Sequence, residues 1–333
     1  AMPPLSTSSG QPTGAVKGVT NMLMNLKKDS EGSSIIVVFD AKGKTFRSDI
    51  YSKYKANRPP MPDDLRDQLA PVKSICRAIG FPLIEIEGVE ADDVIATISK
   101  MAKKAKYKCV ISSLDKDLMQ LVEDPHISMM DTMKHKIFNE ESVFEKFGVK
   151  SNQIRDLLAL VGDASDNIPG VPKVGQKTAA KWLNQYGDLN SIKENAESIK
   201  GVVGENLRNA LDDLDRNLEL VSLKNDVEIN QTFESLLVPN PNEEELNKIF
   251  AELEFKTLDK NKEKEAPKKD SNYEIILDEK GLKNWIAKIN KSKAFAIDTE
   301  TDSVETVSAN LIGISLSVTE NEGCYIPIAH SYE

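Results

Sequence analysis

The chain has 333 residues, 40% of them hydrophobic, and a formal net charge of −10. This length suggests two or three domains with real cores, and the acidic balance excludes a simple basic coat for nucleic acid. Three scattered cysteines without disulfide or zinc spacing indicate a reducing compartment. No apolar run is long enough to span a bilayer and no signal peptide is recognisable, so the sequence predicts a cytoplasmic protein without membrane contact.

The first half of the chain alternates strand and helix patterns. Residues 34–39 form a β-branched apolar run that stops at Asp40, which predicts a buried strand. Residues 89–105 predict a helix with an acidic first turn and a basic last turn. Residues 108–113 predict a second buried strand, followed by another helix. This alternation is typical of a mostly parallel α/β sheet flanked by helices.

The second half begins with a helical pattern. Short helices are predicted at 154–161 and 176–186, on either side of a stretch rich in glycine and proline. Amphipathic helices follow at 205–226 and 242–253. Nearly every residue from 259 to 272 is charged or polar, which predicts a solvated linker.

A new α/β unit begins after this linker. Strand patterns at 273–277 and 294–297 flank a helix pattern at 279–289, and further strands are predicted at 311–318 and 324–328. The chain ends before a second α/β domain of ordinary size would be complete. We therefore expect this unit to be incomplete.

Acidic residues follow the predicted strands or open the predicted helices. In an open α/β sheet these loops meet at one edge, so we expect the acids to converge. Converging carboxylates repel one another unless a cation neutralises them, and hard divalent ions do this best. The pattern therefore predicts two Mg²⁺ or Mn²⁺ ions that support phosphodiester hydrolysis. The predicted metal ligands are Asp40, Glu90, Asp92, Asp93, Asp115, Asp117, Asp163 and Asp166.

Each of these acids also has an ordinary structural explanation. Acids at helix starts are common as caps, and Asp93 or Asp117 taken alone would more often be one. The acids recur in pairs after separate elements, however, and a cap does not need doubling. The pairing favours metal binding for the set. The three histidines lie far apart in sequence, so they do not suggest a catalytic triad as a competing site.

Residues 42–58 reverse the sign of the charge locally, with six basic residues against one acid and two tyrosines interleaved. Such a segment suits a phosphate backbone, with aromatic rings that stack on bases. A solvated basic helix face explains the pattern equally well, and the prolines that follow would end that helix. The DNA-binding residues predicted within this segment are Lys42, Arg47 and Lys53.

The stretch 168–178 resembles a helix-hairpin-helix element, which holds duplex DNA through its backbone without reading sequence. Its glycines permit close approach by a phosphate, and the free N–H groups of the next helix start can bind one. An ordinary glycine–proline turn is the alternative, but two predicted metal ligands lie immediately before it. The predicted DNA contacts are Gly170, Lys173, Gly175 and Lys177.

Four long motifs carry a resemblance to a known family. They are VFDAKGKTFR at 38–47, YKANRPPMP at 54–62, GVEADD at 88–93 and GDASDNIPGV at 162–171. In this order they closely resemble the 5′ nucleases of bacterial DNA polymerase I, a group that includes flap endonucleases. Residues 295–302, FAIDTETD, look like the first motif of the 3′→5′ proofreading exonuclease of the same polymerases.

The resemblance implies roles for individual residues. Asp40, Glu90 and Asp92 would hold the metal nearest the scissile phosphate, and the other acids would surround the second. Lys55 and Arg58 would be catalytic groups on an arch that steers the 5′ strand and stabilises the transition state. A monovalent cation would lie on the hairpin carbonyls. The ligands of a partial proofreading site would be Asp298 and Glu300.

The resemblance also implies a division of the chain. Residues 1–148 would form a PIN-like 5′ nuclease domain, and 149–258 a helical DNA-binding domain with the helix-hairpin-helix. After the linker at 259–272, residues 273–333 would form an incomplete, ribonuclease H-like 3′→5′ exonuclease domain. The family's first strand, which ends in a metal-binding aspartate, would precede the chain, so we expect one ligand and one central strand to be absent.

The function implied is that of a DNA polymerase I fragment carrying a 5′→3′ exonuclease and flap endonuclease. Its substrates would be DNA with a 5′ flap or nick and RNA primers on DNA, cut during replication and repair. It would act as a monomer in the bacterial cytoplasm at the nucleoid. The alternatives are a duplex-binding fragment without catalysis, because the first strand is missing, and a free-standing 5′ nuclease.

Overall fold

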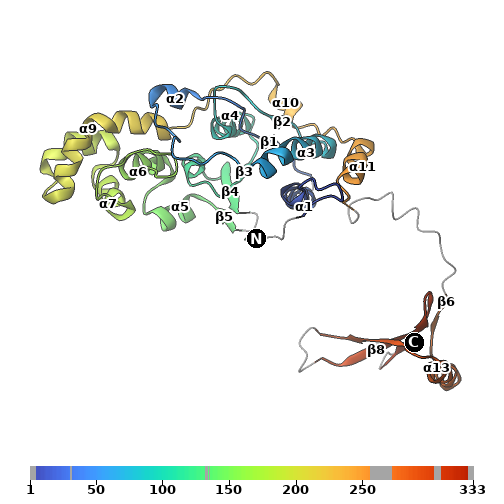
Figure 1. The fold of residues 1–333 in the computed structure, drawn as a ribbon. Coiled ribbons are helices and arrows are strands. Elements are labelled where there is room, and N and C mark those ends of the chain that lie inside the picture. Colours follow the sequence, from blue (N-terminus) through green and yellow to red (C-terminus); the bar gives the residue numbers. More distant parts are fainter. Residues whose placement is uncertain are drawn as a thin grey trace. The chain divides into compact units, whose positions relative to one another are not determined.

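The computed structural model describes residues 5–30, 32–131, 134, 136–255, 272–303 and 309–328. They fall into two compact units, 1–255 and 256–333 (Figure 1). Residues 1–4 and the predicted linker, apart from Asn272, lie outside the described residues. Within the described part of the chain, no helix is long and apolar enough to cross a membrane.

The first part of unit 1 combines very short strands with longer helices. Strand β1 pairs in parallel with β2, and β3 pairs in parallel with β4, which carries β5 antiparallel on its other side. The elements are α1 (Gly14–Asp29), β1 (Val37–Val38), α2 (Phe46–Ile50), α3 (Asp63–Ile79), β2 (Leu83–Ile84), α4 (Ala91–Lys104), β3 (Cys109–Ser112), the 3₁₀ helix η1 (Asp117–Leu121), β4 (Ile127–Asp131), β5 (Lys136–Phe138) and α5 (Glu140–Phe147).

Helix α4 connects the two small sheets, because it contacts both β1 and β3. Its buried face includes Val94, Ile98 and Ala102, which belong to one apolar cluster with Ile84 of β2. The acidic first turn and basic last turn expected from the sequence are both present and suit the helix dipole. This packing fixes the N-terminal end of α4, where the acids lie, relative to the ends of both sheets.

The basic segment 42–58 does not form the single helix that the sequence left open as an alternative. Only α2 forms, because Tyr51 adopts an extended backbone that ends the helix after one turn. The chain then runs through turns, in which Lys55 has the left-handed φ of 55°. The segment therefore follows an irregular path and does not present a regular helix face.

The second part of unit 1 is helical. Helices α6 and α7 have the bounds predicted from sequence, since glycines lie directly beyond their ends. Helix α6 packs against α7 and α9. The elements are η2 (Ser151–Gln153), α6 (Ile154–Val161), α7 (Gln176–Tyr186), α8 (Leu189–Glu194), η3 (Ala196–Ser198), α9 (Gly201–Val221), α10 (Phe233–Leu236) and α11 (Glu243–Glu252).

One buried cluster joins the two parts of unit 1. Val143 and Phe147 of α5 belong to the same apolar cluster as Leu157 of α6 and Leu183 of α7. Such a shared core holds the loop after α6 in a fixed position beside the strands. The acids of that loop can therefore meet the acids of the α/β part.

The described residues of unit 2 form a four-stranded sheet and helix α13. The strand order is β6-β9-β8-β7, with β6 and β9 parallel and the other pairs antiparallel. Trp285 of the helix is 1% exposed and shares a small core with Leu316 and Cys324. The elements are β6 (Asn272–Ile275), α13 (Glu279–Lys291), β7 (Ala296–Thr301), β8 (Leu311–Thr319) and β9 (Glu322–Pro327).

Candidate functional site

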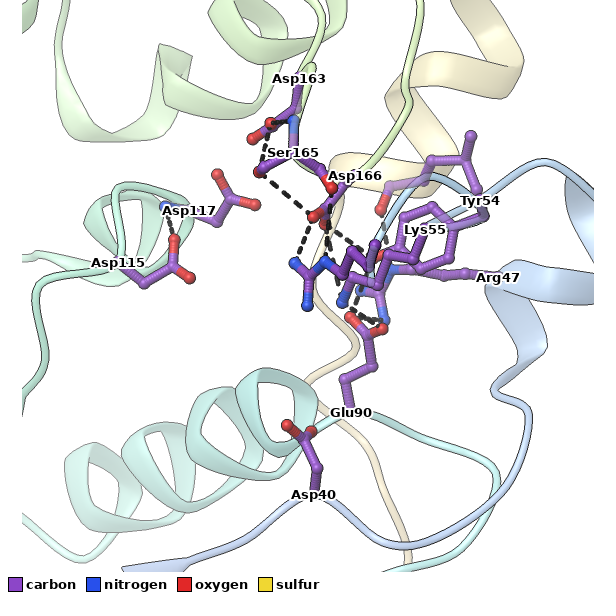
Figure 2. Close-up of polar contacts among 12 residues, drawn as sticks. Asp40, Arg47, Tyr54, Lys55, Glu90, Asp115, Asp117, Asp163, Ser165 and Asp166 are labelled. Atoms are coloured by element: carbon purple, nitrogen blue, oxygen red, sulfur yellow. Dashed lines mark hydrogen bonds and ion pairs between the residues drawn. The ribbon is translucent and has the colours of Figure 1, made fainter. Parts of the chain in front are cut away.

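The predicted metal ligands of unit 1 come from four separate parts of the fold. Figure 2 shows side chains from these parts directed toward one another, among them Asp40, Glu90, Asp115, Asp117, Asp163 and Asp166. Asp40 follows β1, Glu90 precedes α4 and Asp92 and Asp93 lie in its first turn, Asp115 and Asp117 follow β3, and Asp163 and Asp166 follow α6.

Electrostatic coupling shows that these groups are neighbours. Burial, followed by the charge of Asp115, raises the pKa of Asp92 to about 7. Burial likewise raises the pKa of Asp117 to about 7, again with a contribution from Asp115. Oxygen Oδ1 of Asp117 is buried and has no hydrogen-bond partner. A buried carboxylate oxygen without a partner, among other carboxylates, fits a hard cation.

The chain's own cations balance several of these acids. The ammonium of Lys55 lies 2.6 Å from Glu90 Oε1 and 3.6 Å from Asp166 Oδ2. The guanidinium of Arg58 also pairs with Asp166. In this arrangement, the described residues contain no group of three or more His, Cys, Asp or Glu side chains positioned to hold a metal ion.

Lys116 is a further cation that the sequence analysis did not select. Its ammonium lies 2.8 Å from Asp163 Oδ2. Burial acts to raise the pKa of Asp163, but the hydrogen bonds from Lys116 and Ser165 and the charge of Lys116 together outweigh burial and lower that pKa. The position of Lys116 between Asp115 and Asp117 was the available signal, because a cation flanked by two candidate ligands is brought to the same place.

Tyr54 has a role other than the base stacking expected from sequence. It is 8% exposed, and its hydroxyl lies 3.0 Å from Glu90 Oε2 and 3.1 Å from Asp166 Oδ2. Burial, followed by these two charges, raises the pKa of Tyr54. The ring is therefore not free to stack on a base, and the neutral hydroxyl bridges two candidate ligands.

Arg47 and Asp93 depart from their predicted roles. Arg47 is 1% exposed and Asp93 0% exposed, and two hydrogen bonds of 2.6 and 2.8 Å join them. Asp93 also accepts from the backbone N–H of Glu90 at 3.1 Å. Buried from solvent, Arg47 cannot reach a DNA phosphate, and Asp93 is occupied as an ion-pair partner and helix cap. The pair is structural in this fold.

The glycines of the hairpin have different surroundings. Gly162 and Gly170 cross so closely that a Cβ on Gly170 would lie 2.1 Å from Val161 O. Gly170 is thus required for this crossing. A Cβ at Gly175 would meet nothing within 4 Å, and Gly175 is the N-cap of α7. Lys42, Lys53, Lys173 and Lys177 are all exposed.

Comparison with known proteins identifies the family. Residues 1–148 match the 5′-3′ exonuclease N-terminal resolvase-like domain, 149–244 the 5′-3′ exonuclease C-terminal SAM fold, and 273–333 a 3′-5′ exonuclease domain. A 5′-3′ exonuclease from Aquifex aeolicus is 42% identical over 258 residues, 78% of this chain and 88% of that protein. The chain belongs to the 5′-3′ exonuclease family.

Two further likenesses extend this result. DNA polymerase I of Pseudomonas aeruginosa is 43% identical across 100% of this chain, and the chain spans 38% of that protein's length. The structure of the T5 D15 protein co-crystallized with metal ions has a TM-score of 0.57 and 26% identity, covering 72% of this chain and 92% of that one. The predicted family resemblance and the α/β fold class are confirmed.

Unit 2 of this family member carries two of the predicted acids. Asp298 and Glu300 lie two residues apart on β7 and are both exposed. Alternate residues of a strand point to the same face, so the backbone places both carboxylates on one side of the sheet. The described residues of unit 2 do not include a larger set of acids gathered around this pair.

Proposed function

We propose that the chain cuts phosphodiester bonds of DNA and RNA primers near 5′ ends, including 5′ flaps, with the help of divalent metal ions. The observation that supports this most directly is the set of converging carboxylates, in which Asp92 and Asp117 have pKa values raised to about 7. Asp117 also has a buried oxygen without a partner. Such a set binds hard cations more readily than protons at neutral pH.

Two groups of acids suit two Mg²⁺ or Mn²⁺ ions. Divalent ions in such sites lower the pKa of a bound water and neutralise charge on the leaving oxygen. Asp93 falls outside both groups because Arg47 holds it. The proposed ligands are Asp40, Glu90 and Asp92 for one ion, and Asp115, Asp117, Asp163 and Asp166 for the other.

Lys55 and Arg58 are the proposed catalytic cations. Both pair with acids that would hold metal, Lys55 with Glu90 and Asp166 and Arg58 with Asp166. When those acids are neutralised by divalent ions, the two side chains become free to bind the 5′ phosphate and the charge that develops during cleavage. The side chain of Lys55 is 25% exposed and that of Arg58 is 52% exposed, which leaves room for a substrate.

The start of α7 is the proposed site for the duplex. Gly175 caps this helix in open space, and helix N-termini bind phosphate through free N–H groups. Lys173 and Lys177 on either side are exposed and add positive charge. The hairpin carbonyls are the proposed site of a monovalent cation. Backbone contacts of this kind give affinity without sequence preference.

The wider setting is also a proposal. The match of residues 273–333 to a 3′-5′ exonuclease domain supports a place within a bacterial DNA polymerase I that acts as a monomer at the nucleoid. The proposed domain boundaries lie at residues 148 and 258. A duplex-binding role without cleavage is the second candidate, favoured by the pairing of Lys55, Arg58 and Lys116 with the acids.

A flap-cleavage assay separates the two candidates. A labelled 5′-flap duplex is incubated with the chain, and in parallel with the complete product of its gene, in Mg²⁺, in Mn²⁺ and in EDTA. Metal-dependent cutting that Asp92→Ala abolishes, while duplex binding survives, supports the nuclease. Binding without metal-dependent cutting in either protein would leave only the duplex-binding role.

Lys55→Ala is expected to slow cleavage more than it weakens binding. Loss of one transition-state cation typically costs roughly 10²-fold in rate, whereas one phosphate contact changes affinity much less. Single-turnover rates and fluorescence-anisotropy titrations with the flap duplex give the two quantities separately. The control is Lys44→Ala, an exposed lysine of the same segment, which should leave the rate unchanged. A pure loss of affinity in Lys55→Ala would reduce Lys55 to a binding contact.

A further inference from the structure

Two asparagines join the segment that carries Lys55 to the loop that carries Asp166. Asn57 Nδ2 donates to the carbonyl of Ala164 at 2.7 Å, and Asn167 Nδ2 donates to the carbonyl of Lys53 at 2.7 Å. The two bonds run in opposite directions between the same two segments. We call this pair of hydrogen bonds the asparagine clasp.

The clasp surrounds a backbone contact. The N–H of Lys55 donates to the carbonyl of Asp166 at 2.9 Å. In sequence, Lys55 lies between Lys53 and Asn57, the two residues of its segment that take part in the clasp. The two segments are more than a hundred residues apart in the chain. The three hydrogen bonds therefore hold the cation-bearing and acid-bearing segments in one register.

Two residues of the clasp region have a left-handed backbone. Lys55 has a φ of 55° and Asn167 a φ of 57°. Asparagine adopts this region readily, but a lysine does so only when its surroundings hold it there. The hydrogen bonds made by Lys53, Lys55 and Asn57 restrain the backbone immediately before, at and after Lys55. Loss of these bonds removes that restraint, and the ordinary right-handed region is the more favourable one for a lysine.

The direction of the Lys55 side chain depends on this backbone. Its ammonium lies 2.6 Å from Glu90 Oε1 and 3.6 Å from Asp166 Oδ2, and Figure 2 shows Lys55 directed between the two acids. We propose that Asn57 and Asn167 are positioning residues for cleavage, because their clasp holds Lys55 in the left-handed conformation that aims its ammonium into the site. This inference rests on the proposed nuclease function.

The test compares substitutions that remove the clasp in different ways. In the complete gene product, Asn57→Ala and Asn167→Ala are each expected to lower the single-turnover rate on the 5′-flap duplex by roughly fivefold, the worth of one hydrogen bond of ordinary strength. Affinity for the duplex should stay the same. Asn167→Gly loses the bond but keeps easy access to the left-handed region, so its rate should lie between those of Asn167→Ala and the parent.

The matched control is Asn184→Ala. Asn184 makes the same kind of bond, from Nδ2 to the carbonyl of Gly148 at 2.7 Å, between two other segments of unit 1. Its loss should leave the rate on the flap duplex unchanged. If Asn184→Ala lowers the rate as much as Asn167→Ala does, the effect reflects general loosening and the proposal is overturned.

A double substitution separates positioning from a merely structural role. If the asparagines act through Lys55, Asn167→Ala should have no further effect on the rate once Lys55→Ala is present. Additive losses, or unchanged rates in both asparagine variants, would overturn the clasp proposal. Absence of metal-dependent cleavage in the parent protein would instead overturn the nuclease proposal, so the two failures are distinguishable.

Discussion

Asp117→Asn is expected to stabilise the metal-free protein while it lowers cleavage by roughly a thousandfold, since a lost metal ligand removes several kcal/mol of transition-state stabilisation. The carboxylate of Asp117 has a pKa raised from 3.8 to about 7 by burial and by the charges of Asp115 and Asp163. Its ionised form is therefore unfavourable in the folded, metal-free state. An amide of the same shape removes that unfavourable charge.

The sign of the pH dependence follows from this raised pKa. Between the unfolded value of 3.8 and the folded value of about 7, the folded protein binds more protons at Asp117 than the unfolded chain does. Stability contributed by this group is therefore complete below pH 3.8 and is lost as the pH rises through about 7. At neutral pH and above, in EDTA, Asp117→Asn should gain about 1–3 kcal/mol, a rise in Tm of about 2–10 °C for a unit of this size.

Thermal denaturation in EDTA, at pH values on either side of this transition, tests the prediction. Adding Mg²⁺ at the higher pH should raise the Tm of the parent more than that of Asp117→Asn, because a ligand stabilises the state that binds it. Asp163→Asn is the contrasting variant from the same site. Lys116 lowers the pKa of Asp163, so this change should destabilise the metal-free protein at neutral pH. If the Tm of both variants shifted by the same amount and in the same direction, the explanation of their stabilities by the raised pKa of Asp117 and the lowered pKa of Asp163 would be contradicted.

Helices α6 and α7 could be predicted from sequence because the residues at their ends indicate where each helix stops. Helices α6 and α7 were predicted at their observed bounds, because Gly162, Gly175 and Gly187 lie just beyond them. The strands were harder to predict. The apolar run 34–39 forms only the two-residue β1, and β2, with two residues, is too short to give an alternating pattern.

The site acids were predictable as a set, but their individual partners were not. Sequence order indicated that the loops after β1, β3 and α6 would meet at one side of the fold. It gave no sign that Arg47 would be buried against Asp93, or that the Tyr54 hydroxyl would lie between Glu90 and Asp166. These contacts join residues far apart in the chain, so no local pattern in the sequence indicates them.

Arg47→Ala is expected to lower the free energy of unfolding of unit 1 by a large amount for a single substitution. The guanidinium makes two hydrogen bonds to Asp93 and donates to the carbonyls of Leu220 and Ser222 at 2.8 and 3.0 Å. It therefore ties α2, α4 and the end of α9 together. Burial lowers the pKa of Arg47, but the hydrogen bond and charge of Asp93 more than offset this and raise it, so the guanidinium stays charged.

Removing Arg47 leaves the Asp93 carboxylate, 0% exposed, without its counter-ion. Breaking a buried pair in this way typically costs about 3–5 kcal/mol, which corresponds to a fall in Tm of about 6–20 °C for a unit of this size. The free energy of unfolding of Arg47→Lys should lie between those of the parent and Arg47→Ala, because lysine keeps the charge but cannot make the two paired hydrogen bonds. Urea denaturation of each variant gives the free energies directly.

The matched control is Arg66→Ala, which removes an arginine from an ion pair with Asp63 of 2.7 Å between side chains 54% and 85% exposed. Exposed pairs of this kind contribute at most about 1 kcal/mol. If Arg47→Ala were no more destabilising than Arg66→Ala, Asp93 would have to be solvated or protonated after the change, and its assignment as a buried structural carboxylate would fail. A large difference between the two arginines would instead establish that Asp93 is held by Arg47, and so is withheld from the metal-binding set.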